Sequence, residues 1–116
     1  MSWQYQQSTG CFYDEDSFLA TGYSGKEDGR NNPALQNDHF YGPIPQGGYH
    51  IGRLINDPIL GSLVMELTPY WGTETFGRIN LYICGEGAAP VGSIVLKDAD
   101  RLEIAKSDDR VLVVVA

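Results

Sequence analysis

The chain has 116 residues, which is the length of a single domain. Its residues are 42% hydrophobic and 20% charged, which is typical of a globular protein and excludes a disordered chain. Fifteen acidic and eight basic residues give a formal net charge of −7, which repels phosphate backbones and anionic lipids, so we expect no binding to nucleic acid or to a membrane surface.

The first residues, the apolar segments and the cysteines narrow the possible classes of protein further. The first residues lack the basic and apolar runs of a secretory signal, and no window approaches the ~18 apolar residues of a membrane span. We therefore expect synthesis in the cytoplasm and no membrane insertion.

Cys11 and Cys84 could form one disulfide or none, and two isolated buried thiols are the commoner case. Because the cysteines also lack the spacing of a zinc site, we predict no metal and no other cofactor.

The first third of the chain predicts a meander of short strands. Aromatic and polar residues alternate over residues 3–8, and further strands are predicted over 11–13 and 18–23. Gly, Asn, Asp and Pro then dominate residues 24–38, which predicts a loop. Loops of this length inside a compact domain are often functional.

The rest of the chain predicts more strands and one helix. The Gly-Pro-Ile-Pro segment at 42–45 is too rigid for a helix and leads into a predicted strand over 49–55. Asp98 is the candidate N-cap of a helix over 98–106. Residues 110–115 contain four valines and predict a strand buried on both faces. Other strands are predicted over 63–67, 80–84 and 92–96. The sum is a mainly β domain with one short helix near the C-terminus.

The residues by themselves predict no catalytic constellation. His39 follows Asp38 in a loop, and His50 lies in an alternating strand, where a surface histidine is usual. No Gly-x-Ser-x-Gly elbow occurs. The glycine-rich loop at 85–92 lacks the lysine and the following helix of a phosphate-binding loop.

A series of short motifs nevertheless follows a recognisable order over about residues 4–115. They are Gly22-Tyr23-Ser24-Gly25, Asn31-Asn32-Pro33 with Gln36, Gly42-Pro43-Ile44-Pro45 with Tyr49 and Ile51, Leu67-Thr68-Pro69, Phe76-Gly77-Arg78, Ile83-x-Gly85 and Gly92-x-Ile94-Val95-Leu96. Together they resemble the L,D-transpeptidase effectors of type VI secretion. The resemblance implies a small L,D-transpeptidase-like β-sandwich or barrel that exchanges or trims the terminal D-amino acid of peptidoglycan stem peptides. It also implies delivery to the periplasm of a target bacterium, where an immunity protein is one possible partner.

The resemblance breaks at the two catalytic positions. In that family a cysteine thiolate attacks the peptide carbonyl, and a nearby histidine takes and returns the proton. This chain has Cys84 at the histidine position and Ser93 at the nucleophile position, and Pro90 replaces a flanking serine. Loss of the general base alone lowers a rate about 10²–10⁴-fold. The substitutions therefore favour a protein that is inactive by the usual mechanism.

Three hypotheses follow. The first is a catalytically degenerate member that binds a stem peptide, or a protein partner such as an immunity protein, without turnover. The second is a relocated site with Cys84 as nucleophile and His39 or His50 as its base, which requires an imidazole within about 3–4 Å of the thiol. The third is a non-enzymatic adaptor or relic of the fold.

The retained motifs also predict which residues line the substrate groove. Arg78 can pair with a substrate carboxylate, or it can hydrogen-bond carbonyls of the neighbouring loops instead. The predicted groove residues are Tyr23, Ser24, Asn32, Arg78 and Gly92.

Overall fold

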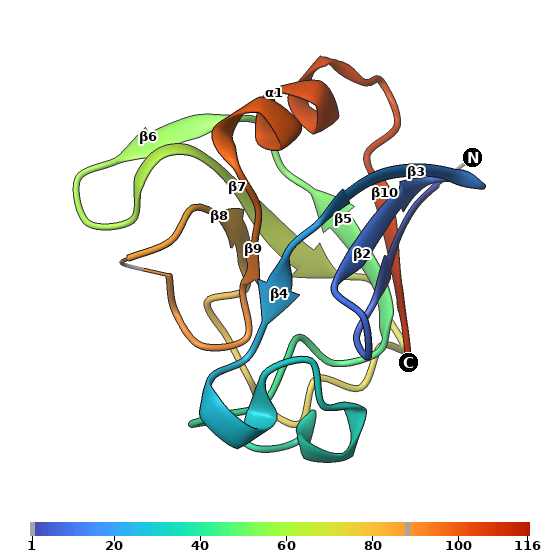
Figure 1. Cartoon of the computed structure of the whole chain (residues 1–116), viewed down its shortest axis with the longest axis vertical. Coiled ribbons are helices and arrows are strands. Elements are labelled where there is room, and N and C mark those ends of the chain that lie inside the picture. The colour runs from blue at the N-terminus through green and yellow to red at the C-terminus, as the bar shows by residue number, and fades with distance from the viewer. Residues whose placement is uncertain (1, 88) are drawn as a thin grey trace.

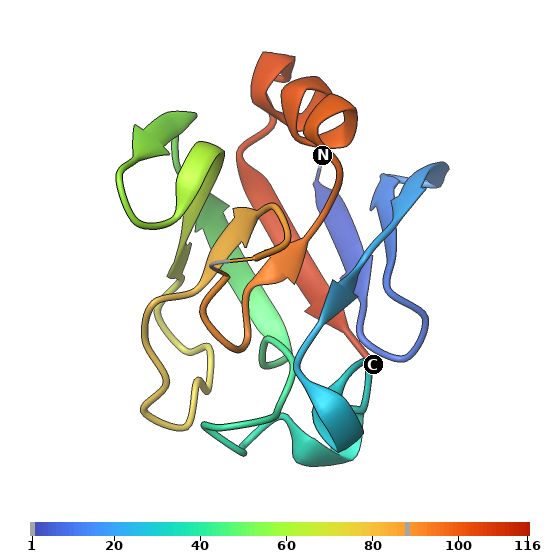
Figure 2. The same cartoon turned by 60° about the vertical axis from the view of Figure 1, so that its left-hand side comes forward.

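The sheet closes on itself because the strands at its two ends are consecutive along the chain. In the computed structural model, which describes residues 2–87 and 89–116, the strands pair in the order β3-β2-β1-β10-β5-β7-β8-β9-β4. Only Gly22 separates β3 (Ser17–Thr21) from β4 (Tyr23–Ser24), and Figure 1 shows one strand running into the other. The result is a nearly closed, barrel-like sheet, and Figure 2 shows it from a second side.

Gly22 permits this closure. Its chain segment turns from pairing with β2 to pairing with β9, and a Cβ atom at position 22 would overlap the carbonyl oxygen of Val95. The Gly22 N–H donates to the carbonyl of Gly10 at 2.8 Å. Residue 22 can therefore lie this close to the backbones of Gly10 and Val95 only because it has no side chain.

The remaining elements confirm a mainly β fold with one short helix near the C-terminus. That helix is α1 (Asp98–Lys106), and it is the only α-helix in the part of the chain that the structure describes. Two pairs of strands are parallel, β1 with β10 and β8 with β9, and the others are antiparallel. The other strands are β1 (Trp3–Gln6), β2 (Cys11–Asp14), β5 (Gly47–Ile51), β6 (Ile55–Asp57), β7 (Gly61–Pro69), β8 (Tyr82–Cys84), β9 (Ile94–Val95) and β10 (Val111–Val115).

Some predicted elements are divided in the structure. The strand expected over 49–55 is two strands, β5 and β6, which pair with different parts of β7. The loop over 24–38 contains two 3-10 turns, η1 (Glu27–Gly29) and η2 (Pro33–Leu35). Among the described residues, no helix has the length and apolarity that crossing a membrane requires.

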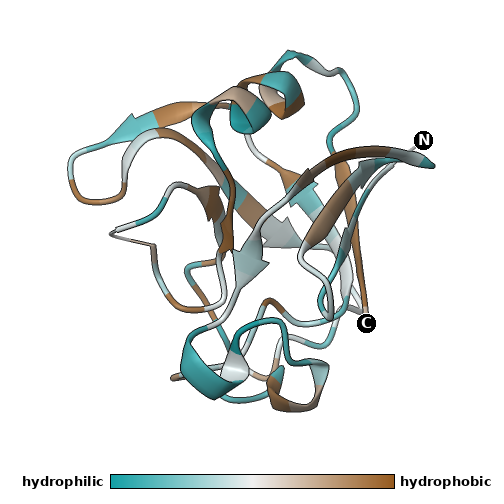
Figure 3. Cartoon of the chain, in the orientation of Figure 1, coloured by the Kyte–Doolittle hydropathy of each residue, from teal (hydrophilic) through white to brown (hydrophobic). Residues whose placement is uncertain are grey.

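The prediction that residues 110–115 are buried on both faces is wrong. Leu112 and Val114 of β10 are buried in the core, but Val111, Val113 and Val115 are only half-buried. The reason is that a single sheet curved around one core leaves its outer face without a second covering layer. Figure 3 shows β10 as a hydrophobic stretch within this sheet.

The predicted N-cap of the helix is also wrong by one residue. Lys97 is the N-cap of α1 and makes no side-chain capping bond, and Asp98 is the first helical residue. The Asp98 carboxylate accepts a hydrogen bond from the Arg101 guanidinium one turn later instead of bonding the helix N-terminus.

The Gly-Pro-Ile-Pro segment crosses the interior with its carbonyls bonded by side chains. All four of its residues are buried, and two prolines leave it few N–H groups with which to join the sheet. Arg78 donates to the carbonyls of Gly42 and Pro43. The other two carbonyls, of Ile44 and Pro45, accept from the Gln7 amide and the Tyr49 hydroxyl, each at 2.8 Å. The segment is therefore fixed by long-range contacts.

Candidate functional site

Tyr23, Val95 and Cys84 form a row across the outer face of three neighbouring strands. Val95 of β9 is opposite Tyr23 of β4 on one side and opposite Cys84 of β8 on the other. Residues in register share a face of the sheet, so these three side chains lie together. Cys84 and Val95 are buried but lie outside the core cluster, which contains their neighbours Ile83 and Ile94. The row is therefore separate from the core.

Ser93 joins this row beside Cys84. It precedes β9 by one residue, so the strand alternation puts it on the same face as Val95. Its hydroxyl accepts from the N–H of Tyr82 at 3.1 Å and donates to the carbonyl of Asn80 at 3.5 Å. It lies close enough to the Cys84 thiol to affect the pKa of that thiol. The structure thus brings together the two positions at which the resemblance expects the catalytic pair.

The environment of Cys84 keeps its thiol protonated. The side chain is 0% exposed, and this burial raises the pKa of the thiol above its ordinary value. The nearby Ser93 hydroxyl and the charge of Arg101 act in the opposite direction, but the pKa stays raised. A neutral thiol is a poor nucleophile, so Cys84 is not activated in this state.

Thiol labelling checks this description. At pH 7 we expect Cys84 to react with an aromatic disulfide reagent at least about tenfold more slowly than Cys11. Cys11 is a free, half-buried thiol, and hydrogen bonds from the Thr9 and Thr21 hydroxyls lower its pKa. The variants Cys11→Ser and Cys84→Ser report the two rates separately. Labelling of Cys84 should continue to rise at pH values where Cys11 has levelled off, and equal rates at pH 7 would contradict the burial of Cys84.

Two adjoining cavities lie along this face and share Tyr23 and Val95; we call them together the outer groove. The larger, of about 530 Å³, reaches the start of α1. The smaller, of about 150 Å³, reaches the β8–β9 loop and Ser93. The side chains that line the groove include Tyr23, Lys26, Arg30, Glu86, Ser93, Val95, Lys97, Asp98 and Arg101.

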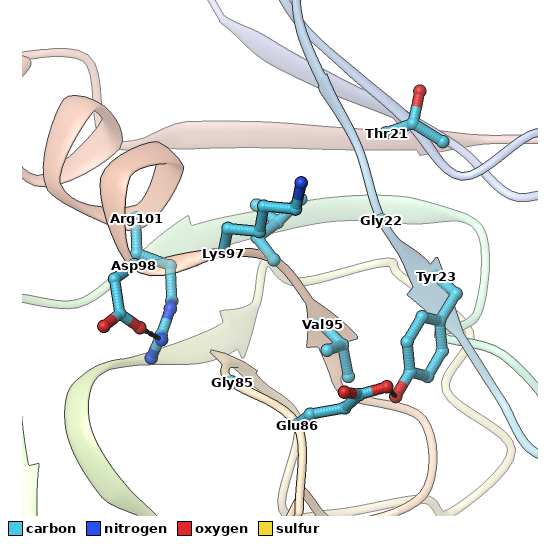
Figure 4. Close-up of a pocket in the computed structure, with 10 residues that line it drawn as sticks. Thr21, Gly22, Tyr23, Gly85, Glu86, Val95, Lys97, Asp98 and Arg101 are labelled. Carbon is cyan, nitrogen blue, oxygen red and sulfur yellow. Dashed lines mark hydrogen bonds and ion pairs between the residues drawn. The ribbon is translucent and has the colours of Figure 1, made fainter.

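A hydrogen bond between Tyr23 and Glu86 crosses the groove. The Tyr23 hydroxyl donates to Oε1 of Glu86 at 3.1 Å, and Figure 4 shows the ring extending past Val95 to that carboxylate. The Arg30 guanidinium stacks on the ring, with its Cζ 3.8 Å from the ring centroid. The bond therefore joins β4 to the loop that follows β8.

The two histidines lie elsewhere. His39 Nε2 is 2.7 Å from the carbonyl oxygen of Phe76, which ties two surface loops together. His50 is exposed on β5 and packs edge-on against Tyr70. The strand β7 lies between β5 and β8, and two strand spacings plus the offset in register put His50 more than roughly 10 Å from Cys84. Among the described residues, neither imidazole is a hydrogen-bond partner of Cys84.

Ser24 and Asn32, which the sequence predicts in a substrate groove, are not among the residues that line the outer groove. Ser24 is buried on the inner face, where its hydroxyl donates to the carbonyl of Gly92 at 3.2 Å and accepts from the Ile44 N–H at 2.8 Å. The Asn32 side chain caps the turn η2 by accepting from the Ala34 N–H at 3.1 Å. Both residues hold the loop rather than a ligand.

Arg78 and Gly92 also have structural contacts. Arg78 is 6% exposed, and its guanidinium donates to the carbonyls of Gln36, Gly42, Pro43 and Val91. The sequence leaves two roles open for Arg78, pairing with a substrate carboxylate or hydrogen bonding to loop carbonyls. The structure shows the hydrogen bonds to loop carbonyls. Gly92 lines the smaller cavity with a φ of +94°, and a Cβ atom there would overlap the Arg78 guanidinium. Arg78 and Gly92 therefore position the turn that carries Ser93.

The sequence interpretation did not place Lys97 or Arg101 in the site. Lys97 lies two residues beyond Val95, so the strand period carries it to the groove face, and Arg101 follows one helical turn later. The spacing of Lys97 and Arg101 from Val95 is the one feature of the sequence that could have indicated them. It is informative only when the face on which Val95 lies is known, and that face depends on pairing with strands distant in the sequence.

The likeness to the L,D-transpeptidase effectors thus rests on the motifs of the sequence, several of which serve to hold the Gly-Pro-Ile-Pro segment and the β8–β9 turn. Comparison of the chain with models of protein families, with curated proteins and with solved structures finds no match.

Proposed function

We propose that this protein is a degenerate member of the L,D-transpeptidase effector family that holds a peptidoglycan stem peptide in the outer groove without turning it over. One observation carries the proposal: Cys84 and Ser93, the two positions at which the resemblance expects the catalytic pair, lie beside each other on neighbouring strands, and Ser93 lines this groove. The family mechanism requires proton transfer between those positions, so their proximity is the arrangement that a former catalytic site would leave.

The chemistry of the pair supports binding without catalysis. A serine hydroxyl needs a strong base to become a nucleophile, and the group beside Ser93 is a neutral, buried thiol. The Ser93 hydroxyl also accepts a hydrogen bond from the Tyr82 N–H. The alternative of a relocated catalytic site with Cys84 as nucleophile lacks support, because neither His39 nor His50 is a partner of Cys84 among the described residues. As a type VI effector, the protein would act in the periplasm of a target bacterium.

A protein partner is the second candidate, and a patch of exposed apolar side chains favours it. Trp71, Phe40 and Ile79 are 102%, 77% and 76% exposed, on the two loops that His39 ties together. Exposed aromatic residues are enriched where proteins dock. These side chains could bind an immunity protein or another protein partner of an adaptor. None of them is among the residues that line the outer groove.

Incubation with purified muropeptides tests the first proposal. We expect tetrapeptide and pentapeptide stems to bind by calorimetry with no change in their mass after prolonged incubation. Tyr23→Ala should abolish binding because it removes the bridge across the groove, whereas Tyr13→Ala, on β2, should leave binding unchanged. Turnover that disappears in Cys84→Ala would establish the relocated site instead. The absence of both binding and turnover would overturn the proposal and leave the adaptor.

A further inference from the structure

The positive charge of this acidic protein gathers along the outer groove. Four of its eight lysines and arginines line the groove, namely Lys26, Arg30, Lys97 and Arg101. Only two of its fifteen acidic residues do so, Glu86 and Asp98. The groove is therefore a cationic strip on a molecule whose formal net charge is −7.

The two acidic residues in the groove already have partners. Glu86 accepts from the Tyr23 hydroxyl, and Asp98 accepts from Arg101. Glu27 and Asp28 follow Lys26 in the chain but are not among the residues that line the smaller cavity. The carboxylates of the groove thus have bonds within the protein.

The cations of the groove, by contrast, have unused donors. In the described part of the chain, the exposed side chains of Lys26, Arg30 and Lys97 make neither an ion pair nor a hydrogen bond. Arg101 is 4% exposed and bonds the carbonyls of Ser62 and Leu63, but its Nε has no hydrogen-bond partner among the described residues. Free donors on fixed or stacked cations are the groups that bind carboxylates.

The cations stand at two ends of an elongated site. The chain from Gly92 to Lys97 runs along the groove, with Gly92 in the smaller cavity and Lys97 in the larger. Ser93, which also lines the smaller cavity, is four residues before Lys97, and four steps of extended chain span about 13 Å. The first and fifth residues of an extended ligand peptide are separated by the same distance. Figure 4 shows Lys97 at the start of α1, between Arg101 and Tyr23. Arg30, stacked on Tyr23, and Lys26 line the smaller cavity.

We propose that the outer groove binds an extended peptide that carries at least two carboxylates. One carboxylate binds at Lys97 and Arg101, the other at Lys26 and Arg30, and the chain between them lies along β9 over the Tyr23–Glu86 bridge. The proposal rests on the proposed function only in using the same groove. It adds the charge of the ligand and the side chains that recognise it.

A pair of matched peptides tests this directly. The probes are capped Glu-Ala-Ala-Ala-Glu and capped Gln-Ala-Ala-Ala-Gln, titrated into the full chain by calorimetry at low ionic strength. The acidic peptide should bind at least about tenfold more tightly, because only its carboxylates make charge-assisted bonds. Its affinity should fall as salt is raised, because exposed charges are screened.

Variants at matched positions locate the binding. Lys97→Gln and Arg30→Gln should each weaken the acidic peptide by about fivefold, as expected for the loss of one exposed charge pair. Lys106→Gln, at the other end of α1, and Arg53→Gln, which lies outside the groove, should leave the affinity unchanged. Equal affinities for the two peptides, equal effects of groove and control variants, or no binding of either peptide would each overturn the proposal.

A stem tetrapeptide with free or amidated carboxylates separates this proposal from the preceding one. If both forms bind equally well, the stem-binding function stands and the charge recognition is wrong. If the capped acidic peptide binds as described and neither stem form binds, the charge recognition stands and the stem-binding function is wrong. Loss of stem affinity on amidation supports both proposals.

Discussion

The double variant Cys84→His/Ser93→Cys is expected to gain turnover of peptidoglycan tetrapeptide stems that the natural sequence lacks. The substitutions supply the base and the thiol that the mechanism of the resembled family uses, at two positions that lie beside each other on neighbouring strands. A positioned general base alone contributes about 10²–10⁴-fold. Product masses from purified muropeptides measure the effect.

The single variants are the controls for this gain. Cys84→His retains a serine as nucleophile, and Ser93→Cys retains a buried neutral thiol in place of the base. We therefore expect both to remain inactive, with a rate that appears only when the substitutions are combined. A folded double variant without turnover would show that the contact between these positions is not a remnant of a catalytic pair.

The variant Arg78→Ala is expected to lower the free energy of unfolding by at least about 3 kcal/mol. Arg78 is buried and donates to four backbone carbonyls that come from three segments of the chain. Without the guanidinium, the carbonyls of Gly42 and Pro43 lose their donor inside the protein, where water does not replace it. Urea denaturation followed by tryptophan fluorescence measures the change.

Two further substitutions make this stability experiment specific. Arg53→Ala removes an exposed arginine and should change the free energy of unfolding by less than about 0.5 kcal/mol. Arg78→Lys keeps the charge but lacks the planar fork that reaches several carbonyls, so it should show most of the loss. A loss below about 1 kcal/mol in Arg78→Ala would mean that the loop carbonyls find other donors.

Local sequence patterns predict most of the elements of this protein. Alternation of apolar and polar residues predicts β1, the strands predicted over 11–13 and 63–67 coincide with β2 and part of β7, and the predicted bounds of the helix are those of α1. The composition predicts a mainly β domain, because β-branched, aromatic and turn-forming residues outnumber sustained helical periods. These features depend on neighbours a few residues apart, so a pattern in the sequence is sufficient to reveal them.

The roles of the motif residues depend on contacts that no local pattern reports. Ser24 and Arg78 are polar residues in loops, which is why they were expected at a ligand groove. The structure buries both, because the Gly-Pro-Ile-Pro segment crosses the interior and needs side-chain donors. The same residue types thus serve either role, and only the path of the chain decides between them.

By itself the sequence determined the class of fold and the acidity of the chain, and its motifs carry the resemblance in which Cys84 and Ser93 stand at the catalytic positions. Only the tertiary structure decided that these two residues lie on neighbouring strands, that both histidines lie away from them, and that half of the basic residues line one groove. The reason is that strand register and sheet closure join residues far apart in the chain. Burial and charge at the site arise from that pairing.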